Sequence, residues 1–248
     1  MRTNKKIRIA IVGYGRMGRA VETEAKARGH EVVACIDKDT ADQIEALKPS
    51  DVDCVIEFTH PEFAVKNYSA LLKNRLTVVT GTTGWYDRME EMQRLVEHGN
   101  HSFLWTSNFS IGVNILFELN RKLAAIMNQY PEYDVYIDEV HHKMKKDAPS
   151  GTAISLADQV VDGLNRKTVW VTDEVQHRAP NPTELTVASS RAGAVIGRHT
   201  VTYTSEIDEI SIHHNALNRR AFAIGAVVAA EWLVEKKGFF HFSDVLKG

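Results

Sequence analysis

The stretch Lys6-Ile-Arg-Ile-Ala-Ile-Val-Gly-Tyr-Gly-Arg-Met-Gly18 decides the fold of this chain. Its residues before the first glycine are mostly apolar and predict a buried strand, which runs directly into a G-x-G-x-x-G turn. Gly13 and Gly15 allow a tight turn and the close approach of a pyrophosphate, and Gly18 lets the following helix pack near the strand. The stretch therefore predicts the start of a dinucleotide-binding domain.

A second strand is predicted at Glu31–Ile36, and the residue after it is acidic. The carboxylate of Asp37 can bind a ribose hydroxyl, which favours NADH. Lys38 follows it and Arg16 lies in the glycine turn, so a 2′-phosphate also has cationic partners. The residues leave NADH and NADPH both open. A structural glycine turn in another α/β fold is the alternative, and the agreement of strand, turn and acid argues against it.

The alternation of strands and helices continues through the first half of the chain. Strands are predicted at 53–58, 76–80 and 102–106, and helices at 62–73 and 85–97. The fourth strand ends in Gly81-Thr82-Thr83-Gly84, a loop of small residues at the edge where parallel sheets bind ligands. This loop can approach a cofactor closely, or it is an ordinary turn.

The alternation stops near Phe109, where we place a domain boundary. A helix through 115–127 and a strand at 135–140 come next, and further strands are predicted at 167–171, 184–188, 195–203 and 209–213. An apolar helix at 221–236 is expected to return to the first domain, which lacks covering helices late in its own sequence.

The predicted fold class is therefore α/β with two domains. Residues 1–109 and 220–248 are expected to form a Rossmann-type nucleotide domain on a parallel sheet. Residues 110–219 are expected to form an α+β domain on a mainly antiparallel sheet.

The segment Glu139–Ala153 concentrates groups that can do chemistry. His141 and His142 end a predicted strand and should point to opposite sides, so one imidazole can face a cleft. We expect no metal site here, because adjacent strand residues point apart and no suitably spaced third ligand is evident.

A helix is predicted to begin in the same segment, at Ser150-Gly151-Thr152. Its first backbone N–H groups and the Thr152 hydroxyl form a ready anion site. Lys145 and Lys146 add positive charge beside it. The alternative is a solvated basic turn with a serine cap. Further along, Arg191-Ala-Gly-Ala-Val-Ile-Gly-Arg-His199 is either a second place for a carboxylate or a basic hairpin.

The composition is that of an ordinary globular protein, with 248 residues that are 44% hydrophobic and 25% charged. The net charge of -2 predicts no nucleic-acid partner. Cys35 and Cys54 lie in apolar runs, which favours buried thiols and a reducing cytoplasm. No apolar run approaches the ~20 residues that a membrane-spanning helix needs, so no membrane partner is expected.

The run from Glu139 to Ala153 closely resembles the signature of bacterial dihydrodipicolinate reductases, the 4-hydroxy-tetrahydrodipicolinate reductases of diaminopimelate and lysine biosynthesis. The similarity extends over essentially the whole chain. It includes the glycine-rich turn, Phe58-Thr59, Gly81–Gly84, Asn108–Asn114, Arg191–His199 and Phe222–Ala226. His60 stands where some relatives carry an arginine, and the connection between the second and third strands is short.

The resemblance implies an NAD(P)H-dependent reduction of a small dicarboxylate. It also implies that the second domain binds the substrate and forms a homotetramer. His141 would be the proton donor and Lys145 the partner of a substrate carboxylate. Gly151 and Thr152 would hold a carboxylate at the helix start, with His142 assisting.

The resemblance further implies a set of residues that contact the cofactor. They are Gly13, Gly15, Arg16, Met17, Gly18, Asp37, Lys38, Phe58, Gly81, Thr82, Thr83, Asn108 and Phe109. Another nicotinamide-dependent dehydrogenase of similar build and a nucleotide sensor without turnover remain as alternatives. The long signature around His141 argues against both.

Overall fold

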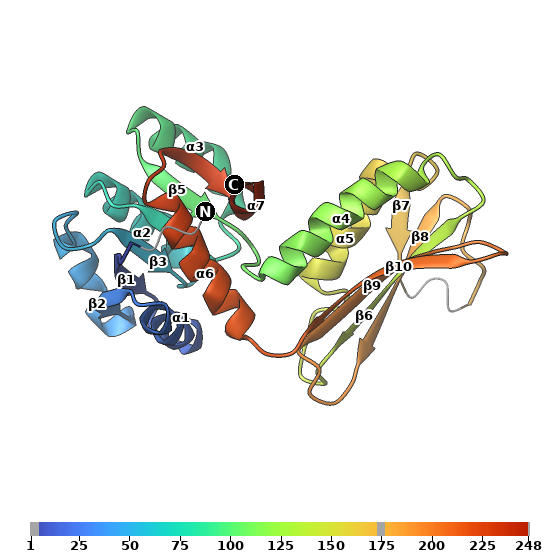
Figure 1. The fold of residues 1–248 in the computed structure, drawn as a ribbon, viewed down its shortest axis with the longest axis horizontal. Coiled ribbons are helices and arrows are strands. Elements are labelled where there is room, and N and C mark those ends of the chain that lie inside the picture. Colours follow the sequence, from blue (N-terminus) through green and yellow to red (C-terminus); the bar gives the residue numbers. More distant parts are fainter. Residues whose placement is uncertain (1–4, 173–176, 248) are drawn as a thin grey trace. The chain divides into compact units, whose positions relative to one another are not determined.

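The computed structural model describes residues 5–172 and 177–247. The chain divides into two compact units (Figure 1). The first comprises residues 1–111 and 220–248, and the second comprises residues 112–219.

The first unit is built on a six-stranded sheet in the order β11-β5-β4-β3-β1-β2. Every pairing in it is parallel, so the predicted Rossmann-type parallel sheet is confirmed. The strands are β1 (Arg8–Val12), β2 (Glu31–Ile36), β3 (Cys54–Glu57), β4 (Val78–Thr80), β5 (Ser102–Trp105) and β11 (Gly238–His241). The sequence pattern did not identify β11 as a strand. It joins the edge at β5, where the ring of Phe239 stacks on that of Phe103 with centroids 5.3 Å apart.

Helices cover both faces of this sheet, because successive strand residues point to opposite sides and both sides are apolar. Ile9 and Ile11 of β1 pack in the cluster with α1 and α6, whereas Ala10 and Val12 pack in the cluster with α2 and α3. The helical segments are α1 (Arg16–Ala27), η1 (Lys38–Ala46), α2 (Pro61–Lys73), η2 (Tyr86–Arg88), α3 (Met89–His98), α6 (Arg220–Leu233) and α7 (Phe242–Lys247).

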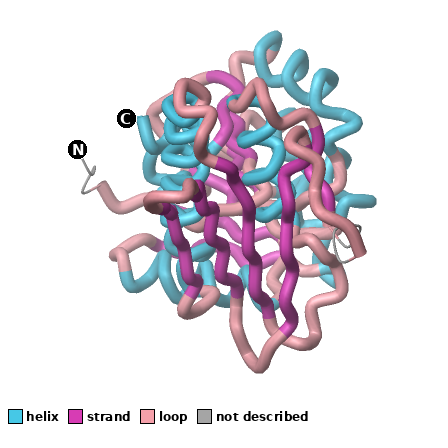
Figure 2. Tube along the Cα trace, turned by 90° about the vertical axis from the view of Figure 1, so that its right-hand side faces the viewer, coloured by secondary structure: helices cyan, strands magenta, loops and turns pink. Residues whose placement is uncertain are grey.

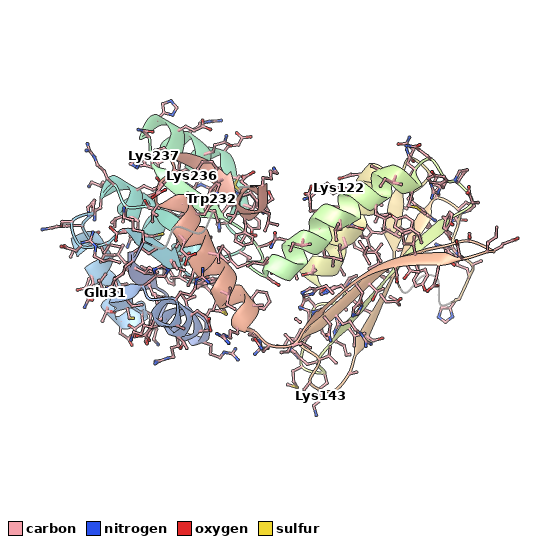
Figure 3. The ribbon with its side chains drawn as sticks, in the orientation of Figure 1. Glu31, Lys122, Lys143, Trp232, Lys236 and Lys237 are labelled. Atoms are coloured by element: carbon pink, nitrogen blue, oxygen red, sulfur yellow. The ribbon has the colours of Figure 1, made fainter. Side chains whose placement is uncertain are left out.

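Charged and polar side chains join α6 to α1 and to the residues that follow α1. Glu231 of α6 accepts hydrogen bonds from Arg28 Nη2 and His30 Nε2, each at 2.7 Å. Arg220 at the start of α6 pairs with Glu24 of α1. Just beyond α6, the ammonium of Lys236 lies 4.5 Å from the centre of the Trp232 ring (Figure 3). The contacts of Glu231 and Arg220 thus hold α6 against α1 and the residues that follow α1.

The second unit contains a five-stranded sheet in the order β10-β9-β6-β8-β7. Its strands are β6 (Asp134–His141), β7 (Val169–Val171), β8 (Glu184–Arg191), β9 (Gly197–Thr204) and β10 (Glu209–Ala216). The pairs β6–β9 and β9–β10 are antiparallel, but β6–β8 and β7–β8 are parallel. The expectation of a mainly antiparallel sheet is therefore corrected to a mixed one. The helix between β6 and β7 returns the chain to the same end of the sheet, so the next strands run parallel to β6.

Two helices, α4 (Ile111–Met127) and α5 (Gly151–Gly163), cover one face of the second sheet. Leu116 and Met127 of α4 and Leu156 and Val160 of α5 share a core with Ile137 of β6. Figure 2 shows strands of this sheet with no helix in front of them, so no helix of the described residues covers the opposite face in this view. In the described part of the chain, no helix is long and apolar enough to cross a membrane.

Candidate active site

The end of β6 places two chemically active side chains on the buried face of the second sheet. Alternate residues of the strand face the core, and this face carries Val135, Ile137, Glu139 and His141. Glu139 is 1% exposed and His141 is 7% exposed. His142, which follows the strand, is only half-buried. The strand period therefore assigns the enclosed position to His141.

The Glu139 carboxylate is a buried acceptor for several donors, one of which is the Ser189 side chain. His141 hydrogen-bonds to it through Nδ1, Arg191 Nη2 donates at 2.8 Å, and the backbone N–H of Ser150 donates at 3.3 Å. Burial favours the neutral acid, but the hydrogen bonds from Arg191, Ser189 and His141 outweigh it and hold the pKa of Glu139 below its usual range. The carboxylate is thus ionised beside the imidazole.

A second imidazole lies against the first. The rings of His141 and His199 meet edge to face, with centroids 5.1 Å apart. Strand register causes this contact, because β9 places His199 opposite Glu139 and β8 places Arg191 opposite His141. On its other side His199 Nε2 lies 3.0 Å from the Ser150 hydroxyl. The sequence pattern identified Arg191 and His199 only as parts of a basic segment and missed their contact with His141.

Burial controls the charge of both imidazoles. It lowers the pKa of His141, and the Glu139 carboxylate only partly offsets this, while the nearby Lys145 and Arg191 charges lower it further. Burial and the neighbouring His141 lower the pKa of His199 to about 3. Both rings are therefore neutral in the free chain at neutral pH.

The same residues are the described group that comes nearest to a metal site. Donor atoms of Glu139, His141 and His199 lie within 4.8 Å of one another. The sequence argument against a metal assumed that no third ligand was close, and the fold brings one there on β9. However, the guanidinium of Arg191 already binds the Glu139 carboxylate, and its positive charge opposes a cation. The arrangement suits a hydrogen-bonded acid better than a metal centre.

The start of α5 lies next to this cluster. Ser150 is its N-cap, and its hydroxyl accepts a hydrogen bond from Ala153 N at 3.2 Å. No atom lies within 4 Å of the place where a Cβ on Gly151 would be, and Thr152 in the first turn is half-buried. The first turn of a helix is a common place for an anion, because its backbone N–H groups lack partners within the helix.

The loop between β6 and α5 carries the lysine of the signature. Lys145 Nζ lies 2.8 Å from Asp147 Oδ2 and 2.9 Å from Oδ1, so the ammonium already has an anionic partner. Arg191 Nη2 donates to the backbone oxygen of Asp147 at 2.6 Å, which ties this loop to β8. Figure 3 shows Lys143 projecting from the tip of the loop. Lys145 is turned inward by comparison and is only partly exposed.

In the first unit, the glycine-rich turn has the shape that a pyrophosphate needs. Gly13 has φ of +94°, and a Cβ there would lie 2.1 Å from the carbonyl oxygen of Phe58. A Cβ on Gly18 would lie 2.6 Å from the Gly13 oxygen. No atom lies within 4 Å of a Cβ on Gly15, and α1 begins at the next residue. Arg16 is exposed and Met17 packs against the core. The turn fits a dinucleotide.

Aromatic rings and glycine meet at the neighbouring strand ends. A Cβ on Gly81 would lie 2.2 Å from the Phe58 ring, and the rings of Phe58 and Phe109 have centroids 5.7 Å apart. Phe109 is only 2% exposed, so its ring packs in the core. Asn108 Oδ1 accepts a hydrogen bond from Ser110 N at 2.9 Å. The structure thus brings the predicted cofactor residues of β3, β4 and β5 together, with Phe58 as their more accessible ring.

The two threonines of the predicted loop differ in their surroundings. Thr82 is buried, and its hydroxyl donates to the carboxylate of Glu57 at 2.8 Å and accepts from the Thr59 N–H at 2.8 Å. Thr83 is exposed. Burial raises the pKa of Glu57, against the hydrogen bonds from the surrounding threonines. Thr82 therefore supports the loop from within, and Thr83 lies on its surface.

Asp37, the acidic residue after β2, also stabilises the start of η1. Asp37 Oδ1 accepts a hydrogen bond from the Asp39 N–H at 2.9 Å and caps η1. Asp37 and Lys38 are both exposed at the carboxyl end of the strand.

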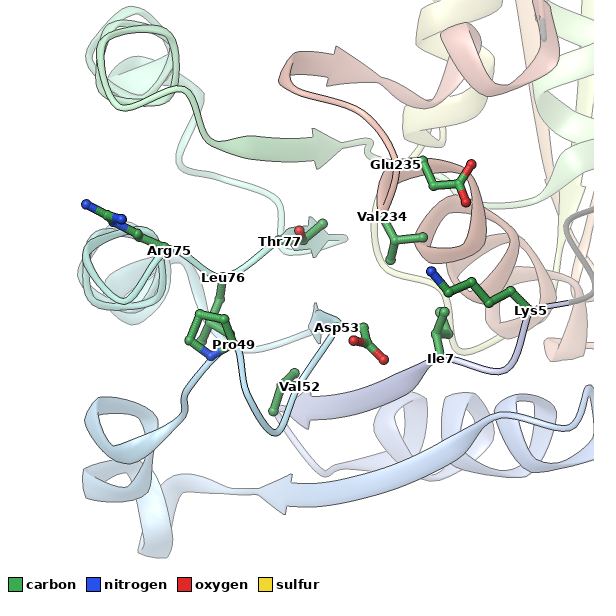
Figure 4. A pocket seen from close by; sticks show the side chains of 10 residues that line it. All are labelled: Lys5, Ile7, Pro49, Val52, Asp53, Arg75, Leu76, Thr77, Val234 and Glu235. Atoms are coloured by element: carbon green, nitrogen blue, oxygen red, sulfur yellow. The ribbon is translucent and has the colours of Figure 1, made fainter.

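A pocket in the first unit lies at the opposite ends of the strands (Figure 4). Ile7, Asp53 and Thr77 line it, and they directly precede β1, β3 and β4. Lys5 and Glu235 add opposite charges to its wall. None of the predicted site residues lines this pocket.

Comparison with known proteins identifies one family over both units. The family described as "Dihydrodipicolinate reductase, N-terminus" matches residues 7–109, and "Dihydrodipicolinate reductase, C-terminus" matches residues 112–246. The chain is 42% identical over 238 residues to a 4-hydroxy-tetrahydrodipicolinate reductase of Christiangramia forsetii, covering 96% of this chain and 97% of that relative. It is 34% identical over 262 residues to the enzyme of that name from Archaeoglobus fulgidus, covering 97% and 100%.

Solved structures share the fold. A dipicolinate-bound dihydrodipicolinate reductase from Paenisporosarcina sp. TG-14 matches with a TM-score of 0.74 and 22% identity, over 97% of this chain and 99% of that one. A DAP dehydrogenase of C. glutamicum in complex with DAP matches with a TM-score of 0.52 and 16% identity, over 96% and 93%.

Proposed function

This chain belongs to the dihydrodipicolinate reductase family, and we propose that it performs the family's reaction at the end of β6. It is an oxidoreductase that reduces 4-hydroxy-tetrahydrodipicolinate to tetrahydrodipicolinate in diaminopimelate and lysine biosynthesis, with a pyridine nucleotide as reductant. The observation that carries the proposed site is a buried imidazole, His141, hydrogen-bonded to Glu139 beside a cationic loop.

We assign proton donation to His141. Its ring is neutral in the free chain because burial lowers its pKa. A dicarboxylate that binds beside it brings negative charge, which favours the protonated ring. His141 thus becomes a proton donor when the substrate is present.

The loop and the helix that follow β6 would bind the substrate. The ammonium of Lys145 would exchange its Asp147 partner for a substrate carboxylate, which forms a charge-assisted hydrogen bond of the same kind. The N–H groups at Gly151 and the hydroxyl of Thr152 would hold a carboxylate at the start of α5, with His142 assisting. The dipicolinate that one solved structural relative binds is a dicarboxylate of this class.

The cofactor would lie on the carboxyl ends of the strands in the first unit. The turn from Gly13 to Gly18, with Arg16 and Met17, would hold the pyrophosphate, and Phe58, Gly81, Thr82, Thr83, Asn108 and Phe109 would border the nicotinamide. When bound, the reduced nicotinamide supplies the hydride. The Asp37 carboxylate suits the ribose hydroxyl of NADH, and Lys38 with Arg16 suits the 2′-phosphate of NADPH, so we propose that both are accepted.

We also propose a homotetramer in the cytoplasm. The uncovered face of the second sheet in Figure 2 supports assembly through this unit. Both cysteines are free thiols, as expected in a reducing compartment.

The test is a direct assay of the purified chain. Oxidation of NADPH and NADH is followed with the freshly formed condensation product of pyruvate and aspartate semialdehyde. We expect substrate-dependent oxidation with both cofactors. If neither NADPH nor NADH is oxidised, the proposed function is contradicted. Nucleotide binding without turnover would identify a sensor.

Lys38→Ala should raise the KM for NADPH more than the KM for NADH.

A further inference from the structure

Two residues close to His141 bear on which of its ring nitrogens carries the proton. We propose that Glu139 and Arg191 are positioning residues for His141: Glu139 holds the Nδ1 proton so that Nε2 delivers the proton, and Arg191 keeps Glu139 ionised and in place. This inference rests on the proposed function, because it concerns the same imidazole.

The hydrogen bond from His141 to Glu139 determines the tautomer. An ionised carboxylate has no hydrogen to donate, so the proton between Glu139 and His141 must belong to the ring. In the neutral ring the second nitrogen then carries a lone pair, and in the protonated ring it carries the transferable proton. The functional nitrogen is therefore Nε2.

The carboxylate can be ionised only because it is well satisfied. Glu139 is 1% exposed, and an unpaired charge at such a position would be strongly disfavoured. Arg191 supplies the compensating charge at 2.8 Å, and the Ser150 N–H adds a further donor. If Glu139 were protonated, its hydrogen bonds to these donors would be weaker.

Arg191 is itself fixed by the backbone on two sides. Its Nη1 donates to the carbonyl oxygen of Ser190 at 2.7 Å, and its Nη2 donates to that of Asp147 at 2.6 Å. The guanidinium therefore joins β8, the loop before α5 and the Glu139 carboxylate. It is a rigid part of the site rather than a surface charge, with its side chain 20% exposed.

The charges around His141 come from four elements. Glu139 on β6 favours the protonated ring, whereas Arg191 on β8 and Lys145 on the loop disfavour it. His199 on β9 is neutral, so it contributes packing without a change of charge in the working range. Asp147 pairs with Lys145 and weakens the effect of that lysine. Replacing Glu139 should thus lower the pKa of His141 directly, and replacing Arg191 should weaken the interaction that keeps Glu139 ionised.

The tautomer can be measured without turnover. The full chain is labelled with ¹⁵N at histidine, and the ring signals of His141 are assigned by their loss in His141→Gln. At neutral pH we expect the proton on Nδ1 and an unprotonated Nε2. A proton on Nε2 would overturn the inference. This measurement needs no change at Glu139 or Arg191, so it decides the matter even where such a variant does not fold.

The pH profile of kcat supplies the second test. Because His141 must be protonated, kcat falls on the alkaline side as that proton is lost. We expect Glu139→Gln to lower kcat about 100-fold and to move this fall to lower pH by about 1 unit. Arg191→Gln should also lower kcat, because Glu139 loses the charge that keeps it ionised and in place, and Arg191→Lys should restore most of the original activity. The KM for the cofactor should not change.

Matched controls come from the other face of the same strands. Asp138 on β6 and Arg198 on β9 are exposed charged neighbours of the site residues in sequence. Asp138→Asn and Arg198→Gln should leave the profile unchanged. An unchanged profile in Glu139→Gln, or an unchanged kcat in Arg191→Gln, would overturn the inference.

The outcomes separate this inference from the proposed function. A chain that does not turn over the substrate contradicts the function and leaves the tautomer result standing. A chain that turns over the substrate with His141 protonated on Nε2 contradicts the positioning roles alone.

Discussion

At His141, two opposing effects set the affinity for a proton. Burial in the second unit lowers the pKa of the ring, and the hydrogen bond to Glu139 raises it. Burial prevails in the free chain, and the negative charge of a bound dicarboxylate would restore the proton. The imidazole would therefore be protonated only when the substrate is bound.

Replacement of His141 tests this role directly. His141→Gln removes the donor but keeps a polar side chain of similar length. We expect kcat to fall about 100-fold to 10,000-fold, the range for loss of a general acid. Cofactor binding, measured by fluorescence titration, should be unaffected. Unchanged turnover would remove His141 from the mechanism.

Lys145 should act on binding as well as on rate. The ammonium has its own partner in Asp147, so its loss leaves the loop with an unbalanced carboxylate near the substrate. We expect Lys145→Met to raise the substrate KM about 10-fold to 100-fold, as for one hydrogen bond to a charged group. The adjacent exposed Lys146 is the control, and Lys146→Met should have little effect. Equal effects of the two changes would contradict a specific carboxylate contact.

At the level of elements, a half-buried acid on α6, Glu231, binds residues that follow α1. Burial raises the pKa of Glu231, but hydrogen bonds from Arg28 and His30 outweigh it and hold the pKa below its usual range. A carboxylate with a lowered pKa in the folded state stabilises the protein above the pKa of the unfolded chain. This contribution is lost as the pH falls through the folded pKa.

Glu231→Gln should therefore destabilise the chain in a pH-dependent way. We expect the free energy of unfolding to fall by about 1–3 kcal/mol at pH 7, because two charged hydrogen bonds are weakened. The difference from the unmodified chain should shrink as the pH falls below about 4. Denaturant unfolding of both proteins at several pH values measures this difference in the free energy of unfolding. Glu90→Gln, at an exposed ion pair on α3, should change stability by less than about 1 kcal/mol at any pH.

At the scale of the whole molecule, the second sheet has one face that no helix covers in the part of the chain that the structure describes. Tyr136 on β6 is 36% exposed, and its neighbours Val135 and Ile137 face the core on the other side. Sheets that leave apolar side chains on an open face are common sites of assembly.

Tyr136→Glu tests whether that face joins copies of the chain. A charge at the centre of the face should break the proposed homotetramer into smaller species, detected by light scattering, because an unpaired charge in an interface is unfavourable. Glu118→Gln on the exposed side of α4 is the control and should leave the mass unchanged. A tetramer that persists in Tyr136→Glu would exclude this face as the essential contact.

The sequence by itself determined the local features of this protein. Glycine positions, strand lengths and apolar periods are local properties, so they were sufficient for the parallel sheet and for the turn at Gly13. The same is true of the strand that presents His141 and of the cap at Ser150. The long signature from Glu139 onward was also sufficient to identify the family.

Only the tertiary structure decided which distant residues meet. The pairing of Glu139 with Arg191 and of His141 with His199 depends on how β8 and β9 align with β6. The parallel pairing of β6 with β8 and the sixth strand, β11, depend on chain crossovers in the same way. Strand register and crossover direction arise from the packing of whole elements, and the burial that lowers the pKa of His141 exists only once those elements have packed.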